Sequence, residues 1–192
     1  MSARFFILMS LLGAVVLTPA CAPVIVAGGA TAAVATTDRR SVGTQLDDEN
    51  IELTARRKLN DDNRLGDDIH VNITCYNGTL LLSGEATTAG QRDIVVSLVS
   101  TLKGVKRIIN EIAVAEPRAF VNTTNDGWIT GKVKAKLLGI EGLPSNQIKV
   151  VTENSVVYLM GLVTQKEGEL AAEATRTVGG INRVVKLFEY LD

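Results

Sequence analysis

The chain has 192 residues, of which 46% are hydrophobic and 21% are charged, a composition that fits a globular protein with an apolar N-terminus. The formal net charge is −1, so there is no global electrostatic argument for nucleic acid, and only 4% of the residues are aromatic, fewer than base-stacking surfaces need. We therefore expect no nucleic-acid partner. Two cysteines, Cys21 and Cys75, are too few for a disulfide framework.

The N-terminal segment predicts a signal peptide. Arg4 supplies its positive region, an apolar stretch follows, and the small residue Ala20 directly precedes Cys21. This segment resembles the lipobox of bacterial lipoproteins, so we expect residues 1–20 to be removed and Cys21 to be acylated. An uncleaved membrane anchor and ordinary secretion stay open as alternatives, although Pro19 would break a spanning helix.

The next segment predicts a tether. Residues 22–37 are mostly Ala, Val, Gly and Thr, and they show neither charge nor periodicity. We therefore expect residues 21–45 to comprise the acylated cysteine and a flexible tether.

Residues 46–115 predict a first module, which begins with a helix. Ile51, Ala55 and Leu59 are spaced by four residues, so they share one apolar stripe. The carboxylates of Asp47–Glu49 suit the positive N-terminal end of such a helix.

The rest of this module predicts three strands and a second helix. Ile69, Val71 and Ile73 alternate with polar residues as in a strand, and Asn77–Gly78 is a strong hairpin signal. The later segments are a returning strand at 79–85, a helix at 88–102 and a strand at 105–113. Because the last strand follows a helical crossover, it should lie parallel to the second strand. The prediction is a three-stranded mixed sheet with two helices on one face.

An internal repeat sets the number of domains. Asn154 and Gly161 follow Asn77 and Gly84 by the same 77 positions, within the same pattern of turn and apolar strand. A glycine inside a strand often marks the close approach of another backbone. We therefore predict that Gly84 and Gly161 are structural, with a neighbouring helix as the approaching element.

Residues 125–192 predict the second module, and residues 116–124 predict the joint between the two. Asn125–Asp126 should cap a helix that runs to about Leu138. The later elements are strands at 147–153, 156–164 and 183–191, with a helix at 166–178 before the last strand. The predicted fold class is α+β, with two tandem modules of order αββαβ.

The sequence offers no catalytic or metal-binding constellation. His70 is the only histidine, so a histidine-rich metal site and a Ser-His-Asp triad both lack residues they need. We expect it to be an exposed strand residue beside Asn72. Capping and solvation explain Asp47–Glu49 and Asp61–Asp62, since no calcium-loop spacing follows, and Cys75 is typical of a small buried residue. The chain is predicted to bind no metal and no cofactor and not to be an enzyme.

Three segments carry a resemblance to a known family. Residues 40–45 (RSVGTQ), 125–130 (NDGWIT) and 159–164 (LMGLVT) look close to segments of the dual BON-domain lipoproteins of Gram-negative outer membranes. The resemblance implies a lipid-anchored outer-membrane protein that faces the periplasm, binds anionic phospholipid, gathers at division sites and supports envelope integrity. It also implies that the first helix of the second module carries the lipid surface, and that Ala22 directs sorting to the outer membrane.

On a helical wheel, this helix has two apolar stripes. The inner stripe matches the core stripe of the first module and comprises Ile129, Val133, Leu137 and Ile140. The second stripe points well away from it and comprises Trp128, Gly131, Ala135 and Leu138. The corresponding positions of the first module are mostly polar: Asn50, Leu53, Arg57 and Asn60. The shared fold therefore does not require the second stripe.

Lys132, Lys134 and Lys136 flank the second stripe, and an apolar patch with lysines at its margin is typical of an interfacial helix. The predicted lipid-binding residues are Trp128, Gly131, Lys132, Lys134, Ala135 and Leu138. Packing of Trp128 against the first module and contact with a protein partner stay open as alternatives. The predicted partner is an anionic phospholipid membrane surface. The alternative function is an adaptor for envelope enzymes, for the outer-membrane assembly machinery or for division-site proteins.

Overall fold

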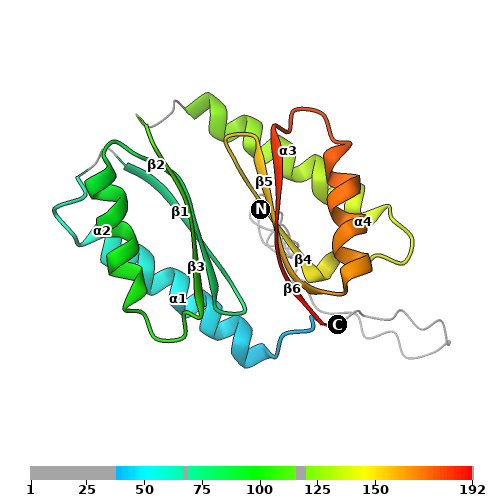
Figure 1. The fold of residues 1–192 in the computed structure, drawn as a ribbon, viewed down its shortest axis with the longest axis horizontal. Coiled ribbons are helices and arrows are strands. Elements are labelled where there is room, and N and C mark those ends of the chain that lie inside the picture. The colour runs from blue at the N-terminus through cyan, green and yellow to red at the C-terminus, as the bar shows by residue number, and fades with distance from the viewer. Residues whose placement is uncertain (1–37, 67–68, 116–119, 192) are drawn as a thin grey trace, which may run out of the picture. The chain divides into compact units, whose positions relative to one another are not determined.

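The computed structural model of the protein describes residues 38–66, 69–115 and 120–191 (Figure 1). The predicted signal peptide, Cys21 and the tether up to residue 37 lie outside these ranges. None of the helices in these ranges combines the length and the hydrophobicity that a bilayer-spanning segment requires.

The first module contains α1 (Val42–Asn60), β1 (Ile69–Tyr76), β2 (Thr79–Ala86), α2 (Ala89–Ser100) and β3 (Arg107–Val114). Strand β2 pairs antiparallel with β1 and parallel with β3, as the helical crossover predicts. Helix α2 begins with a capping box, because Thr88 Oγ1 accepts the Gln91 N–H and the Gln91 side chain accepts the Thr88 N–H. In Figure 1, α1 and α2 lie on the same face of this sheet.

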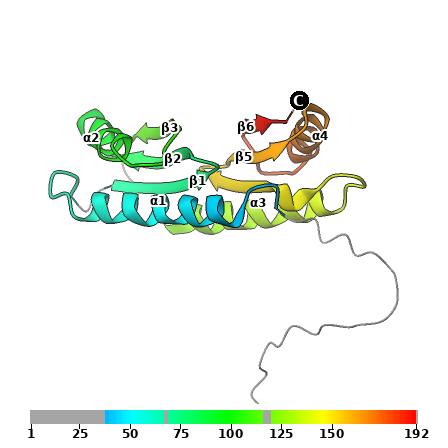
Figure 2. The ribbon, with the colours of Figure 1, turned by 90° about the horizontal axis from the view of Figure 1, so that it is seen from below.

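The second module repeats this order with α3 (Phe120–Leu138), the 3-10 helix η1 (Ser145–Gln147), β4 (Ile148–Glu153), β5 (Val156–Val163), α4 (Gln165–Arg176) and β6 (Arg183–Tyr190). Strand β5 pairs antiparallel with β4 and parallel with β6. Thr164 and Glu167 form the capping box of α4. Figure 2 shows α1 running beneath β1 and α3 beneath β4. The predicted α+β fold of two tandem αββαβ modules is confirmed.

Each module has its own hydrophobic core between its helices and its sheet. The predicted inner stripes are buried in these cores: Ile51, Ala55 and Leu59 in α1, and Ile129, Val133 and Leu137 in α3. Ile140, the fourth predicted member, follows the end of α3 and is only partly buried against the same core. Burying one such Ile or Leu side chain contributes about 1.5–3 kcal/mol. These stripes therefore determine which face of each helix remains available to other contacts.

The sheet faces that point away from the helices share a third apolar cluster, which the sequence analysis did not predict. Its buried members are Tyr76, Leu81, Tyr158 and Met160. The Tyr76 hydroxyl also donates a hydrogen bond to the Gln147 carbonyl oxygen (3.2 Å). Both faces of β2 are therefore covered, which explains why its apolar run is continuous rather than alternating.

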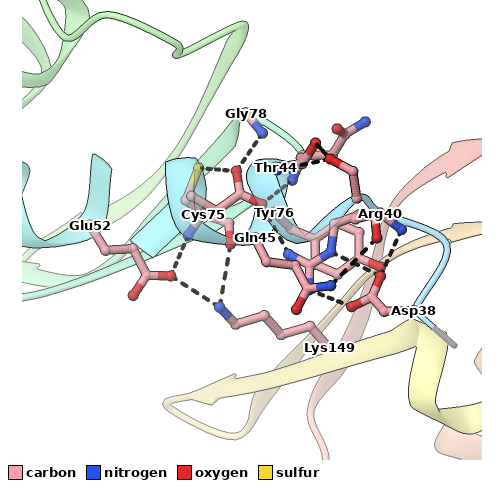
Figure 3. Close-up of polar contacts among 12 residues, drawn as sticks. Asp38, Arg40, Thr44, Gln45, Glu52, Cys75, Tyr76, Gly78 and Lys149 are labelled. Carbon is pink, nitrogen blue, oxygen red and sulfur yellow. Dashed lines mark hydrogen bonds and ion pairs between the residues drawn. The ribbon is translucent and has the colours of Figure 1, made fainter. Parts of the chain in front are cut away.

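Lys149 of β4 adds a polar link between the modules (Figure 3). Its Nζ donates to Glu52 Oε1 (3.0 Å) and to the Cys75 carbonyl oxygen (3.3 Å). Cys75 itself is buried, as predicted, and its Sγ–H donates to Asp48 Oδ1 (3.2 Å). Burial, reinforced by this carboxylate, raises the pKa of the Cys75 thiol to about 12. The thiol is therefore a neutral packing group.

The first helix of each module starts earlier than predicted. Helix α1 begins directly after Ser41, whose Oγ accepts a hydrogen bond from the Thr44 N–H (3.0 Å). Helix α3 begins at Phe120, inside the stretch that was assigned to the joint. The helix N-terminal roles predicted for Asp47–Glu49 and Asn125–Asp126 are therefore wrong, because these residues lie within the helices.

Asp48 and Asp126 point inward instead and hold the two hairpin turns. The Asp48 carboxylate accepts hydrogen bonds from the backbone N–H groups of Asn77 (2.7 Å) and Gly78 (2.8 Å). Asp126 makes the same pair of bonds to the turn between β4 and β5, at 2.7 and 2.8 Å. Both carboxylates are buried, so solvation does not explain them. Each fixes a turn whose N–H groups would otherwise lack partners.

Gly84 and Gly161 meet neighbouring backbone, but the approaching element is not one of the helices packed on the sheet. A Cβ on Gly84 would lie 2.0 Å from the His70 carbonyl oxygen of β1. A Cβ on Gly161 would lie 2.4 Å from the carbonyl oxygen of Gln147, the last residue of η1. The prediction that a packed helix approaches is therefore wrong: the close backbone lies in the paired strand β1 for Gly84, and at the junction of η1 with the paired strand β4 for Gly161.

Candidate functional site

Helix α3 separates a core face from an exposed face. Ile129 and Val133 are fully buried, whereas Trp128 is 68% exposed and Leu138 is 74% exposed. Gly131 and Ala135 are also exposed. At 100° per residue, these four exposed positions centre on the side of the helix opposite the core. We call Trp128, Gly131, Ala135 and Leu138 the outer stripe.

The exposure of Trp128 tests the alternative that its ring packs against the first module. Packing against the first module would bury the indole ring, but Trp128 is among the most exposed large apolar residues in the described ranges. The cluster shared by the two sheets does not include it. The domain-packing alternative is therefore wrong for Trp128, and the outer stripe is accessible.

The three lysines of α3 lie at both margins of the outer stripe. Lys132 Nζ donates to the Gly179 carbonyl oxygen (2.7 Å) and lies 6.0 Å from the centroid of the Trp128 ring. Lys134 and Lys136 are exposed, with Lys134 on the margin opposite Lys132. Between residues 127 and 140, lysines are the only charged side chains. The exposed surface of α3 in this range is thus apolar and positive.

Helix α1 differs from α3 at the corresponding positions. Asn50, Arg57 and Asn60 are exposed polar residues. Because α1 starts earlier than predicted, it also contains the exposed residues Val42 and Leu46, which lie before the helix start expected from the sequence. Glu49 lies within the same stripe, at seven residues from Val42. The exposed apolar surface of α1 is thus interrupted by a carboxylate.

A groove of about 260 Å³ lies beside Leu138. Its apolar walls come from Leu137, Leu138, Ile148 and Val150. Its polar residues are Lys134, Ser145 and Asn146. The residues of α3 could be identified from the sequence but those of η1 and β4 could not, because only the fold brings the three elements together.

His70 lies beside Asn72, as predicted, and its side chain is 43% exposed. The prediction missed Glu153 of the second module, whose Oε1 is 3.8 Å from His70 Nε2. Asn72 Nδ2 donates to the same carboxylate (2.6 Å), and burial raises the pKa of Glu153. These contacts join the two modules. Within the described residues, no group of three or more His, Cys, Asp and Glu side chains is arranged to hold a metal ion.

The comparisons with known proteins agree with this architecture. The model of the BON domain family matches the chain twice, over residues 47–116 and 125–192. The outer membrane lipoprotein DolP of Haemophilus influenzae is 34% identical over 182 residues, which cover 95% of this chain and 94% of that protein.

Two further relatives are similar over most of their length. The 21 kDa hemolysin of Actinobacillus pleuropneumoniae is 36% identical over 154 residues, covering 80% of this chain and 79% of that protein. Osmotically-inducible protein Y of Escherichia coli is 29% identical over 147 residues, covering 74% and 72%. With two family matches and a relative aligned over nearly its whole length, the chain belongs to the BON-domain family, as a dual BON-domain lipoprotein of the outer membrane.

Proposed function

We propose that this lipoprotein is not an enzyme and that it binds anionic phospholipid through the outer stripe of α3. The observation that carries the proposal is the exposure of Trp128 and Leu138 on the face opposite the core. Two large apolar side chains in water, on a helix whose only charged residues between positions 127 and 140 are lysines, suit an anionic membrane interface. Helix α1 lacks this combination of apolar and positive residues, because Glu49 lies among its exposed apolar side chains.

The outer stripe alone would bind weakly. Burying Trp128 contributes about 2 kcal/mol, and each lysine near an anionic surface adds about 1 kcal/mol. A lipid anchor raises the effective concentration of the stripe at the bilayer, so weak contacts are sufficient there. The stripe would therefore set the orientation and the lipid preference of a protein that is already attached.

The non-acylated protein should co-sediment with vesicles that contain phosphatidylglycerol and much less with vesicles of phosphatidylcholine alone. Raising the salt concentration from about 0.1 M to about 1 M should weaken this binding, because the screening length falls from about 10 Å to about 3 Å. Vesicle pelleting followed by gel densitometry measures both effects. A protein that pellets with neither kind of vesicle would contradict the proposal. If the fraction bound to anionic vesicles did not change with salt concentration, the role of the lysines would be contradicted.

At the cellular level, we propose that lipid binding supports outer-membrane integrity and envelope maintenance linked to cell division. The family resemblance described above and the exposed stripe support this role. The Trp128→Glu variant provides the test, with detergent sensitivity and the position of a fluorescent fusion as readouts. An unchanged phenotype in cells whose variant no longer binds vesicles would contradict the link between the two.

A second candidate function, a protein-binding adaptor, is favoured by the exposed apolar residues of α1. Val42, Leu46 and Leu53 are 73%, 54% and 48% exposed, and the carboxylate of Glu49 beside them disfavours an anionic bilayer. Envelope enzymes, the outer-membrane assembly machinery and division-site proteins are the proposed partners. Substituting Leu46 would impair such an adaptor without changing vesicle binding, so the two functions are separable.

We also propose that Cys21 carries the lipid. Changing Cys21 to Ser should release the protein from the membrane fraction, because the outer stripe by itself contributes only weak attachment. Fractionation together with labelling by a fatty acid measures this. Incorporation of the labelled fatty acid into the variant would contradict the assignment.

A further inference from the structure

The groove beside Leu138 combines apolar walls with one positive charge. Leu137, Ile148 and Val150 are almost fully buried and form its interior. Lys134 is exposed at its edge, and no carboxylate is among the residues that line it. Leu138 belongs both to the groove and to the outer stripe. The groove therefore opens next to the surface that the proposed function places against the bilayer.

The first module has a hollow at the corresponding place, which serves as an internal comparison. Leu59 and Asn60, the counterparts of Leu137 and Leu138, line it together with Val71. Val71 faces Gly84 across the sheet just as Ile148 faces Gly161. The fold itself thus produces a hollow between the end of the first helix and the first strand of each module.

The chemistry of the two hollows is nevertheless different. In the first module, Asn60 stands in place of Leu138, and the lining includes Asp62. The Arg64 guanidinium beside Asp62 lowers the pKa of this carboxyl to about 2, so it stays negative at neutral pH. The charge of Asp62 is compensated by its ion pair with Arg64, and no Lys or Arg lines this hollow, whereas Lys134 lines the second one and attracts phosphate. Only the second hollow is therefore suited to an anionic amphiphile.

We propose that the groove of the second module holds one anionic phospholipid, with its phosphate at Lys134 and the start of one acyl chain against the apolar walls. This inference rests on the proposed function, because the outer stripe brings the groove to the lipid surface. A volume of 260 Å³ has room for about nine groups of the size of a water molecule, which suits part of one lipid rather than a whole one.

The same features argue for a lipid rather than free phosphate. Phosphate alone would need several donors around it, but most of the groove wall is apolar. A phospholipid would contact both the charged and the apolar residues of the groove, because its phosphate pairs with Lys134 while its chain covers Leu137 and Ile148. The outer stripe would thus provide general contact with the bilayer, and the groove would select a single headgroup.

The test uses dihexanoyl phosphatidylglycerol below its critical micelle concentration, so that no lipid surface is present. Titration into the non-acylated protein should shift the backbone amide signals of Ser145, Asn146 and Ile148. Ser145→Phe should fill the groove and remove most of these shifts. Lys134→Gln should weaken binding about fivefold, the value expected for one lysine at an anionic surface. Asn63→Phe, in the hollow of the first module, is the matched control and should change nothing.

The outcomes separate the groove from the outer stripe. If Ser145→Phe loses monomer binding but still pellets with anionic vesicles, the groove is a site of its own. Monomer binding that survives both Ser145→Phe and Lys134→Gln, or that is absent from the wild type, would overturn the inference. The wild type could still bind anionic vesicles in that case, so a result against the groove is distinguishable from a result against the proposed function. Melting temperatures of the variants exclude misfolding as the cause of a loss.

Discussion

Replacing Trp128 with Glu should reduce binding to anionic vesicles by about 100-fold while leaving the fold intact. The ring is 68% exposed and belongs to neither core, so its removal opens no cavity. The substitution removes about 2 kcal/mol of ring burial and adds about 1 kcal/mol of repulsion from the lipid headgroups. A total of about 3 kcal/mol corresponds to roughly two orders of magnitude in affinity.

Two further variants make this experiment decisive. Leu138→Glu lies on the same stripe and should act in the same direction. Asn50→Glu, at the position of α1 that corresponds to Trp128, should change little. Vesicle co-sedimentation and melting temperature should be measured on all three proteins. Equal binding by all three would contradict the membrane role of α3, and a large fall in melting temperature for Trp128→Glu alone would indicate a structural role for the ring.

The outer stripe could be predicted from the sequence because it depends on local periodicity. The spacing of Ile129, Val133 and Leu137 identifies the buried face, and the opposite face then follows from the geometry of a helix. The internal repeat shows, in addition, that the outer stripe is not part of the shared fold. Positions occupied by Trp128 and Leu138 in one copy are Asn50 and Asn60 in the other, so the fold alone does not require apolar residues there.

The role of Asp48 could not be predicted from its neighbours alone. An acidic residue near the expected start of a helix is explained locally by the helix dipole, whereas its actual partners are turn N–H groups about 30 positions later in the chain. The internal repeat nevertheless indicated that Asp48 has a structural role. Asp48 and Asp126 are identical in the two copies, whereas Glu49 is replaced by Gly127. A residue kept in both copies at one position of the helix indicates a contact that the fold itself needs.

The groove and the cluster between the sheets could not be predicted for a different reason. Lys134 and Ile148 meet only after α3 has packed against β4, and no local pattern records that contact. For the cluster, the continuous apolar run of β2 indicated burial on both faces. It did not reveal that residues such as Tyr158 of the other module provide the cover.

Replacing Gly84 with Ala should be among the most destabilising single substitutions in the chain. The new Cβ would lie 2.0 Å from the His70 carbonyl oxygen, and the residue has a φ of 113°, which favours glycine. Overpacking of this kind costs about 1–3 kcal/mol, and strained backbone adds about 1–3 kcal/mol. Gly161→Ala should cost less, because its Cβ would lie 2.4 Å from the Gln147 oxygen but its φ lies outside the left-handed region.

Gly127→Ala is the matched control for both substitutions. A Cβ on Gly127 would meet nothing within 4 Å, and the residue lies inside α3, so alanine should stabilise the protein. The expected gain is about 0.5–1 kcal/mol. Thermal unfolding should therefore rank the proteins as Gly127→Ala, wild type, Gly161→Ala and Gly84→Ala, in order of falling melting temperature. A shift of about 2–4 °C is expected for each kcal/mol in a protein of this size. If Gly84→Ala had the same melting temperature as the wild type, β1 would be able to move away from the new methyl group, and the glycine would not be structurally required.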